Sequence, residues 1–163
     1  MKSKKKNFPT PILSLEFYLE GYHQLVDKLK LEHDVAQLSK HLKCQLDSAT
    51  LEILETSNYE ALVMTDLNKE IVWANNGFRE MTGYSTTFAR GKKPSFLQGK
   101  DTMEDDRQFI RARLSTEKRF RASITNYKKN GDKYLCQIDV IPLFNTNDQL
   151  THFLAMESEL KVA

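Results

Sequence analysis

The fold of this chain is decided by the stretch NNGFREMTGYS, Asn75–Ser85. Asn75 has the side chain of a helix N-cap, because its amide oxygen can accept a hydrogen bond from a backbone N–H of the first turn. Phe78 and Met81 follow at helical spacing and share one face. Gly83 predicts the end of the helix, since glycine readily adopts the left-handed conformation found there. The stretch therefore predicts a short helix with one apolar face and two sharp boundaries.

Short β-prone runs surround this helix on both sides. The predicted strands are residues 61–65, 71–74, 120–126, about 133–143 and about 150–158. Lys129–Asp132 predicts a hairpin turn, because its Asn-Gly pair accepts the positive φ that tight hairpins need. A second helix is expected over Thr102–Leu114, opened by Asp101 as the N-cap with Glu104 three positions on. The order is two strands, short helices, then three strands.

Residues 13–55 show helical periodicity instead. Apolar residues recur at a 3-4-3-4 spacing in Leu15, Tyr18, Tyr22, Leu25 and Leu29. After a phase slip, the stripe resumes in Val35, Leu38, Leu42, Leu46, Ala49 and Ile53. The slip is either a stutter in one helix or a break between two.

Some forty helical residues exceed what the flank of one small domain can cover. We therefore expect a homodimer, and its interface residues are Leu15, Tyr18, Tyr22, Leu25, Leu29, Val35, Leu38 and Leu42. The alternative is that the helix packs on its own domain. The last predicted strand is apolar on both faces and needs a cover on each, so the helical region is also a candidate for one of these covers.

The order of elements and two local motifs resemble a PAS domain. Asn75–Ser85 is similar to the family's N-x-x-F-x-x-x-[TS]-G-Y-[ST] segment, and Asn126–Gly131 to its N-Y-x-K-x-G hairpin. The resemblance covers about residues 56–160. It implies an α+β PAS fold, in which a five-stranded antiparallel sheet carries short helices on one face, here with a long N-terminal helical extension.

A narrower resemblance lies in the loop GKKPSFLQG, Gly91–Gly99. It looks like G-R-N-C-R-F-L-Q-G, the photoactive loop of light-oxygen-voltage (LOV) domains, whose cysteine forms an adduct with flavin. Pro94 stands in the place of that cysteine. Proline has no thiol, so the resemblance implies that adduct chemistry at this position is impossible.

The LOV resemblance also implies flavin contacts, of which two are retained. Gln98 matches the loop glutamine, and Asn126 matches the first asparagine that contacts the ring. Four others differ: Lys93, Ser95, Cys136 and Glu157. An ionised carboxylate can only accept hydrogen bonds, whereas an amide donates and accepts. We therefore expect no cofactor, with flavin as the alternative. Gln98, Asn126, Cys136 and Glu157 form either a small polar pocket that senses a ligand or part of a packed core.

Composition narrows the class of protein. The formal net charge is only +2, from 24 basic and 22 acidic residues, so the sequence does not predict nucleic-acid binding. Residues 1–12 are expected to be a disordered basic tail. No run resembles an export signal or a membrane span, which predicts a cytoplasmic protein with reduced cysteines. The four histidines do not converge on a metal-ligand spacing, and no catalytic arrangement is recognisable.

These observations predict a single PAS domain over residues 56–160, preceded by a helical region at 13–55. By family analogy it is a non-catalytic sensory or protein-interaction module in bacterial-type signal transduction, acting through dimerisation and a partner output protein. The alternative is a sensor that binds a small molecule, such as flavin, without adduct photochemistry.

Overall fold

The computed structural model describes residues 11–160, with side chains from Leu15 onward. Its elements are α1 (Pro11–Leu42), α2 (Ser48–Thr56), β1 (Ala61–Asp66), β2 (Ile71–Ala74), α3 (Asn76–Thr82), α4 (Thr86–Ala89), η1 (Pro94–Leu97), α5 (Glu104–Leu114), β3 (Phe120–Tyr127), β4 (Lys133–Phe144) and β5 (Leu150–Glu159). The chain forms two compact units that divide after Gln37.

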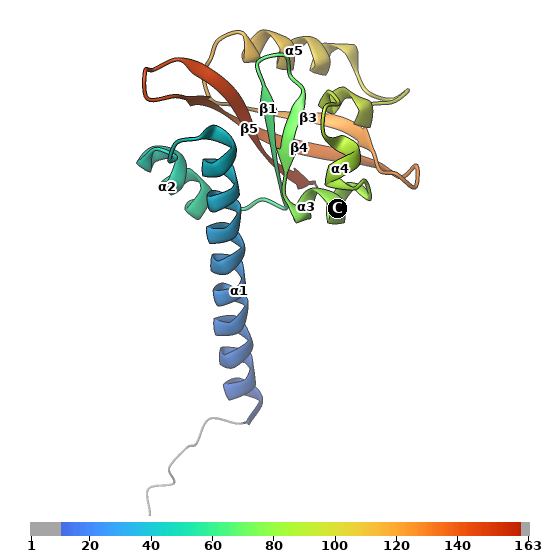
Figure 1. Ribbon diagram of the computed structural model, residues 1–163. Coiled ribbons are helices and arrows are strands. Elements are labelled where there is room, and N and C mark those ends of the chain that lie inside the picture. The colour runs from blue at the N-terminus through green and yellow to red at the C-terminus, as the bar shows by residue number, and fades with distance from the viewer. Residues whose placement is uncertain (1–10, 161–163) are drawn as a thin grey trace, which may run out of the picture. The chain divides into compact units, whose positions relative to one another are not determined.

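The second unit contains one antiparallel sheet with the strand order β2-β1-β5-β4-β3, which confirms the predicted fold class (Figure 1). The C-terminal strand β5 is central and pairs with β1 on one side and β4 on the other. Helix α3 contacts β1, α4 contacts β2 and α5 contacts β3. These short helices and one face of the sheet enclose the main apolar core, in which Phe78 is fully buried.

Local chemistry sets the boundaries of α3 as the sequence predicts. The Asn75 side chain accepts a hydrogen bond from the Phe78 N–H, and Gly83 ends the helix with φ of 78°. The same Asn75 oxygen also accepts from the Leu62 N–H of β1 at 3.0 Å. One side chain thus caps the helix and fixes it to the sheet. Gly131, in the predicted hairpin turn, has φ of 91°.

The helical extension differs from the prediction at both ends. The expected tail at residues 1–10 lies outside the described residues, but Pro11 and Ile12 belong to α1, because proline is well tolerated in a first helical turn. The phase slip after Leu29 is a stutter, since α1 continues through it to Leu42. The break comes later, at residues 43–47, where Lys43 has a left-handed φ of 57°.

The second face of the sheet is also buried. Its buried apolar side chains are Leu62, Met64, Ile141, Leu143, Leu154 and Met156. Leu38, Leu46 and Leu54, from the end of α1, the linker and α2, are buried outside the main core. Burial lowers the pKa of His152 on this face, and the charge of His41 at the end of α1 lowers it further, against the opposing charge of Asp66. The end of α1 thus lies near this face. These leucines are therefore available to cover the second face.

Candidate functional site

Four polar side chains from three strands meet on the core face of the sheet. Asn126 on β3 is opposite Tyr134 on β4, and Glu157 on β5 is opposite Ile138, two residues beyond Cys136. Asn126 and Glu157 are each 6% exposed, and Cys136 is completely buried. The structure thus brings together three of the four predicted pocket residues and adds Tyr134.

The hydrogen bonding of this cluster is incomplete. The Cys136 thiol donates to the Glu157 carboxylate, with 3.9 Å between Sγ and Oε2. Within the described part of the chain, the Asn126 Oδ1 and the Tyr134 hydroxyl are buried without a hydrogen-bond partner. Asn126 and Tyr134 are directly opposite each other on β3 and β4. Burial raises the Tyr134 pKa and hydrogen bonding with Asn126 lowers it in part, so the two groups are neighbours without a well-formed hydrogen bond.

Burial also changes the acid–base properties of the cluster. It raises the pKa of Glu157 to about 7, because no nearby cation compensates for lost hydration. Burial raises the pKa of Cys136 far above its usual value, with a further contribution from the charge of Glu157. The same two causes, together with Cys136, raise the pKa of Tyr134. The thiol and the phenol therefore stay protonated, and Glu157 is the group that titrates near neutrality.

Gln98 lies on the loop and not on the sheet. It is half-buried at the end of η1, and its backbone N–H donates to the Ser95 carbonyl at 3.0 Å. Among the described residues, no hydrogen bond connects it to the strand residues, and none connects Asn126 to Cys136 or Glu157. The single pocket that the resemblance implies for all four residues stays a prediction.

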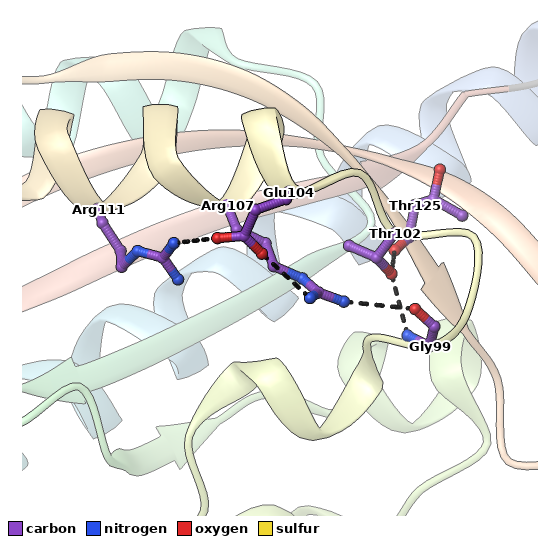
Figure 2. A network of polar contacts seen from close by, with 6 residues as sticks. All are labelled: Gly99, Thr102, Glu104, Arg107, Arg111 and Thr125. Carbon is purple, nitrogen blue, oxygen red and sulfur yellow. Dashed lines mark hydrogen bonds and ion pairs between the residues drawn. The ribbon is translucent and has the colours of Figure 1, made fainter.

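The loop that carries Gln98 is fastened to α5 and β3 (Figure 2). The Thr102 hydroxyl donates to the Thr125 carbonyl at 2.7 Å and accepts from the Gly99 N–H at 3.0 Å. Arg107 donates to the Gly99 carbonyl at 3.3 Å. The end of the loop is therefore held by both a strand and a helix.

This network corrects the predicted start of α5. The helix begins at Glu104, not at Thr102, and its N-cap Met103 makes no side-chain hydrogen bond. Thr102 is used to hold the loop instead, so it cannot also lie within the first helical turn. Glu104, in the first turn of α5, accepts hydrogen bonds from Arg107 and Arg111 further along the helix (Figure 2).

Two arginines pair with one aspartate on the opposite face of the sheet. Asp139, 7% exposed, accepts two hydrogen bonds from Arg119 and one from Arg121, at 2.7–2.9 Å. A hollow beside them is lined by Ser57, Asn58, Arg121, Gln137, Asp139, Met156 and Ser158. None of these residues was among the predicted site residues. A signal was available in part, because Asp139 is the one acidic residue within β4.

The polar groups on the core face only partly match those that the LOV resemblance implies for flavin. Asn126 keeps its amide, whereas Cys136 and Glu157 present a thiol and a carboxyl in place of amides. A thiol is a weak donor and acceptor, so it does not replace an amide at a flavin edge.

The predicted interface residues on α1 differ in exposure, and Val35 is half-buried. Leu15, Tyr18, Tyr22, Leu25 and Leu29 are each more than half exposed. We call these five residues the α1 stripe. Leu38, by contrast, is completely buried within the second unit, and Leu42 is half-buried there. Leu38 is therefore a core residue and is not available to a second chain, which corrects that part of the prediction.

A membrane-crossing helix and a metal-binding cluster are both absent from the part of the chain that the structure describes. No helix among residues 11–160 is long and apolar enough to cross a membrane. Within the same range, no group of three or more histidine, cysteine or acidic side chains is placed to hold a metal ion.

Known proteins match the sheet and its helices. Residues 60–157, more than half of the chain, match a family model described as PAS domain. A voltage-gated inwardly rectifying potassium channel from Homo sapiens is 37% identical over 92 residues, which are 55% of this chain and 8% of the channel. A nitrogen fixation regulatory protein from Klebsiella oxytoca is 30% identical over 103 residues, which are 63% of this chain and 21% of the regulator.

A solved structure gives the same fold. The dark structure of the blue-light photoreceptor Aureochrome1 LOV has a TM-score of 0.64 at 24% identity, covering 71% of this chain and 85% of that one. At this identity the likeness shows the fold alone. The chain spans only a small part of the two curated relatives.

Proposed function

The chain belongs to the PAS domain family, a family of sensory domains in signalling proteins, and on that premise we propose that it is a non-catalytic sensory and protein-interaction module. It pairs with a second copy of itself through α1 and passes its signal to a partner output protein. The observation that carries this proposal is the exposed α1 stripe.

The spacing of the stripe supports a second copy as the occupant. Leu15, Tyr22 and Leu29 take one heptad position, and Tyr18 and Leu25 take the other, as in a two-stranded coiled coil. Leaving five large apolar side chains more than half exposed forgoes about 1.5–3 kcal/mol for each aliphatic one that a partner could bury. A stripe with this repeat is self-complementary, because each side chain can insert between those of an identical helix.

Charge placed in the stripe tests the dimer. Leu25→Asp combined with Leu29→Asp should give a monomer in sedimentation equilibrium, because pairing would bury four carboxylates without partners. Gln24→Asp is the matched control, since it adds charge away from the stripe and should leave the subunit number unchanged. A double variant with the sedimentation of the parent chain would refute the proposal. Leu38→Asp is unsuitable, because it would disrupt the core.

A second candidate function rests on the two unpaired polar atoms. Asn126 Oδ1 and the Tyr134 hydroxyl would be satisfied by a small ligand that carries both a donor and an acceptor and enters after local repacking. Native mass spectrometry of the intact chain tests this, because it reports bound mass and subunit number together. A reproducible extra mass, absent in Asn126→Leu and retained in the control Gln137→Leu, would support it.

The same sample distinguishes the ligand classes. A flavin would show itself by its visible absorption, and a colourless ligand would not. The dimer proposal expects two subunits without added mass, and a chain that binds nothing in any preparation would contradict the second candidate.

A further inference from the structure

Glu157 lies where the helical extension enters the sheet. Its backbone carbonyl accepts a hydrogen bond from the Glu60 N–H at 2.8 Å, and Glu157 pairs in register with Ala61, the first residue of β1. Residues 57–60 are the short connection from α2 to β1. The backbone of Glu157 therefore holds this connection, while its side chain points into the core.

No cation compensates the Glu157 carboxyl. Of the charged groups around the cluster, Glu60 and Glu159 act on the Cys136 thiol as further negative charges. Glu159 is itself paired with Lys128 at 2.7 Å. In the part of the chain that the structure describes, no ion pair includes Glu157.

One cation lies beside the cluster: Lys128 Nζ is 5.4 Å from the centre of the Tyr134 ring, where its charge is shared with Glu159. Cys136 and Tyr134 on β4 remain protonated, and Asn126 on β3 is neutral. The helical side chains in the same core are apolar: Phe78 and Met81 from α3, Ala89 from α4 and Leu97 from η1. A negative charge on Glu157 is thus isolated in an apolar, hydrogen-bond-poor environment.

The carboxyl has one hydrogen-bond partner in the core. Within the described part of the chain it accepts from the Cys136 thiol, with 3.9 Å between Sγ and Oε2, and a thiol is a weak donor. Tyr134, which is opposite Asn126, lies on β4 four residues before the partner of Glu157. Loss of the proton therefore leaves a buried carboxylate with a single weak donor.

We propose that the Glu157 carboxyl is a proton-binding site whose occupancy controls how firmly the α2–β1 connection is held to the sheet. In the protonated state the carboxyl stays in the core and β5 keeps its pairing with β1. On loss of the proton to solvent, the unpaired charge favours positions nearer water, which weakens the Glu60–Glu157 bond at the end of β5. This input needs no cofactor and does not depend on dimerisation.

The pKa of Glu157 supports the proposal, because burial raises it to about 7. At that value, small changes around neutral pH alter the fraction of chains in which the carboxyl is protonated. Neither of the other cluster groups that can ionise titrates near this value.

Infrared spectroscopy of the full chain tests the proton site. A titration from about pH 5 to about pH 9 should show a protonated-carboxyl band that disappears with a midpoint near 7. Glu157→Gln should remove the band, and Glu159→Gln should keep it, because Glu159 is a surface group paired with Lys128. Cys136→Ala, which removes the hydrogen-bond donor to the carboxylate, should raise the midpoint.

Hydrogen exchange of the same samples tests the coupling. After correction for intrinsic exchange, amides 60–62 should exchange faster at about pH 8 than at about pH 6 in the parent chain, and equally in Glu157→Gln. The absence of a titrating carboxyl band would overturn the proton site. A band that titrates while the exchange of these amides stays constant would overturn its control of the connection.

Discussion

Gly77 is the residue whose substitution should most directly disturb the junction between the helical extension and the sheet. A Cβ added at Gly77 would overlap the Glu60 carbonyl oxygen and lie 3.3 Å from Asn75 Oδ1. The Glu60 backbone cannot retreat freely, because its N–H is bonded to Glu157 at 2.8 Å. Asn75 is equally fixed, since its oxygen holds both Leu62 and Phe78. Alanine at position 77 must therefore displace backbone.

The cost follows from three contributions. Overpacking a fixed site costs about 1–3 kcal/mol, and weakening the Glu60–Glu157 hydrogen bond adds about 1 kcal/mol. The higher helix propensity of alanine returns about 1 kcal/mol. Gly77→Ala should thus lower the free energy of unfolding by about 2 kcal/mol, which for a chain of this size lowers Tm by about 4–8 °C.

Thermal denaturation followed by circular dichroism measures this change. Gly21→Ala is the matched control, because a Cβ at Gly21 in α1 meets no atom within 4 Å and should not lower Tm. If Gly77→Ala melts at the temperature of the parent chain, the close approach of α3 to the Glu60 backbone is not part of the native structure.

Three further substitutions test the electrostatics and the loop. Between pH 4.5 and about 7, Glu157 keeps its proton in the native state but has lost it in the unfolded chain. The free energy of unfolding should therefore fall by about 3 kcal/mol as the pH rises through this range. Glu157→Gln should remove this pH dependence, as measured by urea denaturation. Burial opposes ionisation of Asp139, but the hydrogen bonds from its two arginines outweigh it and hold its pKa below 3.8. The ionised Asp139 therefore stabilises the fold above pH 3.8, and this contribution is lost as the pH falls. Asp139→Asn should lower the free energy of unfolding by about 1–2 kcal/mol at neutral pH, a value reduced because the guanidinium groups are partly exposed. The same variant should show a smaller loss of stability in acid than the parent chain. Thr102→Val should cost about 1–3 kcal/mol by leaving a backbone donor and acceptor unpaired, and a parent-like urea midpoint would contradict the network in Figure 2.

Local chemistry made the fold predictable. The cap at Asn75, the left-handed Gly83 and the Asn-Gly hairpin each depend on neighbours in sequence, and the structure confirms them. The LOV resemblance also implied that Asn126, Cys136 and Glu157 share a pocket, and the structure places all three, from three different strands, on the core face of the sheet.

Local patterns failed where a distant partner competed for the same residue. Thr102 has the sequence context of a helix start, yet its hydroxyl bonds to Thr125 of β3. Leu38 belongs to the apolar positions that resume in α1 after the phase slip, but it is buried within the second unit. Periodicity shows that a face is apolar, and it does not show what covers that face.

Local motifs and the order of elements were enough to predict the PAS fold, the helical extension with its apolar stripe, and the residue types on the core face. Only the tertiary structure decided that Glu157 is isolated from any cation among the described residues, that Tyr134 joins its cluster, and that the backbone of Glu157 holds Glu60. The reason is physical: turn and cap preferences arise within a few residues, whereas desolvation and charge pairing depend on side chains brought together from strands far apart in the chain.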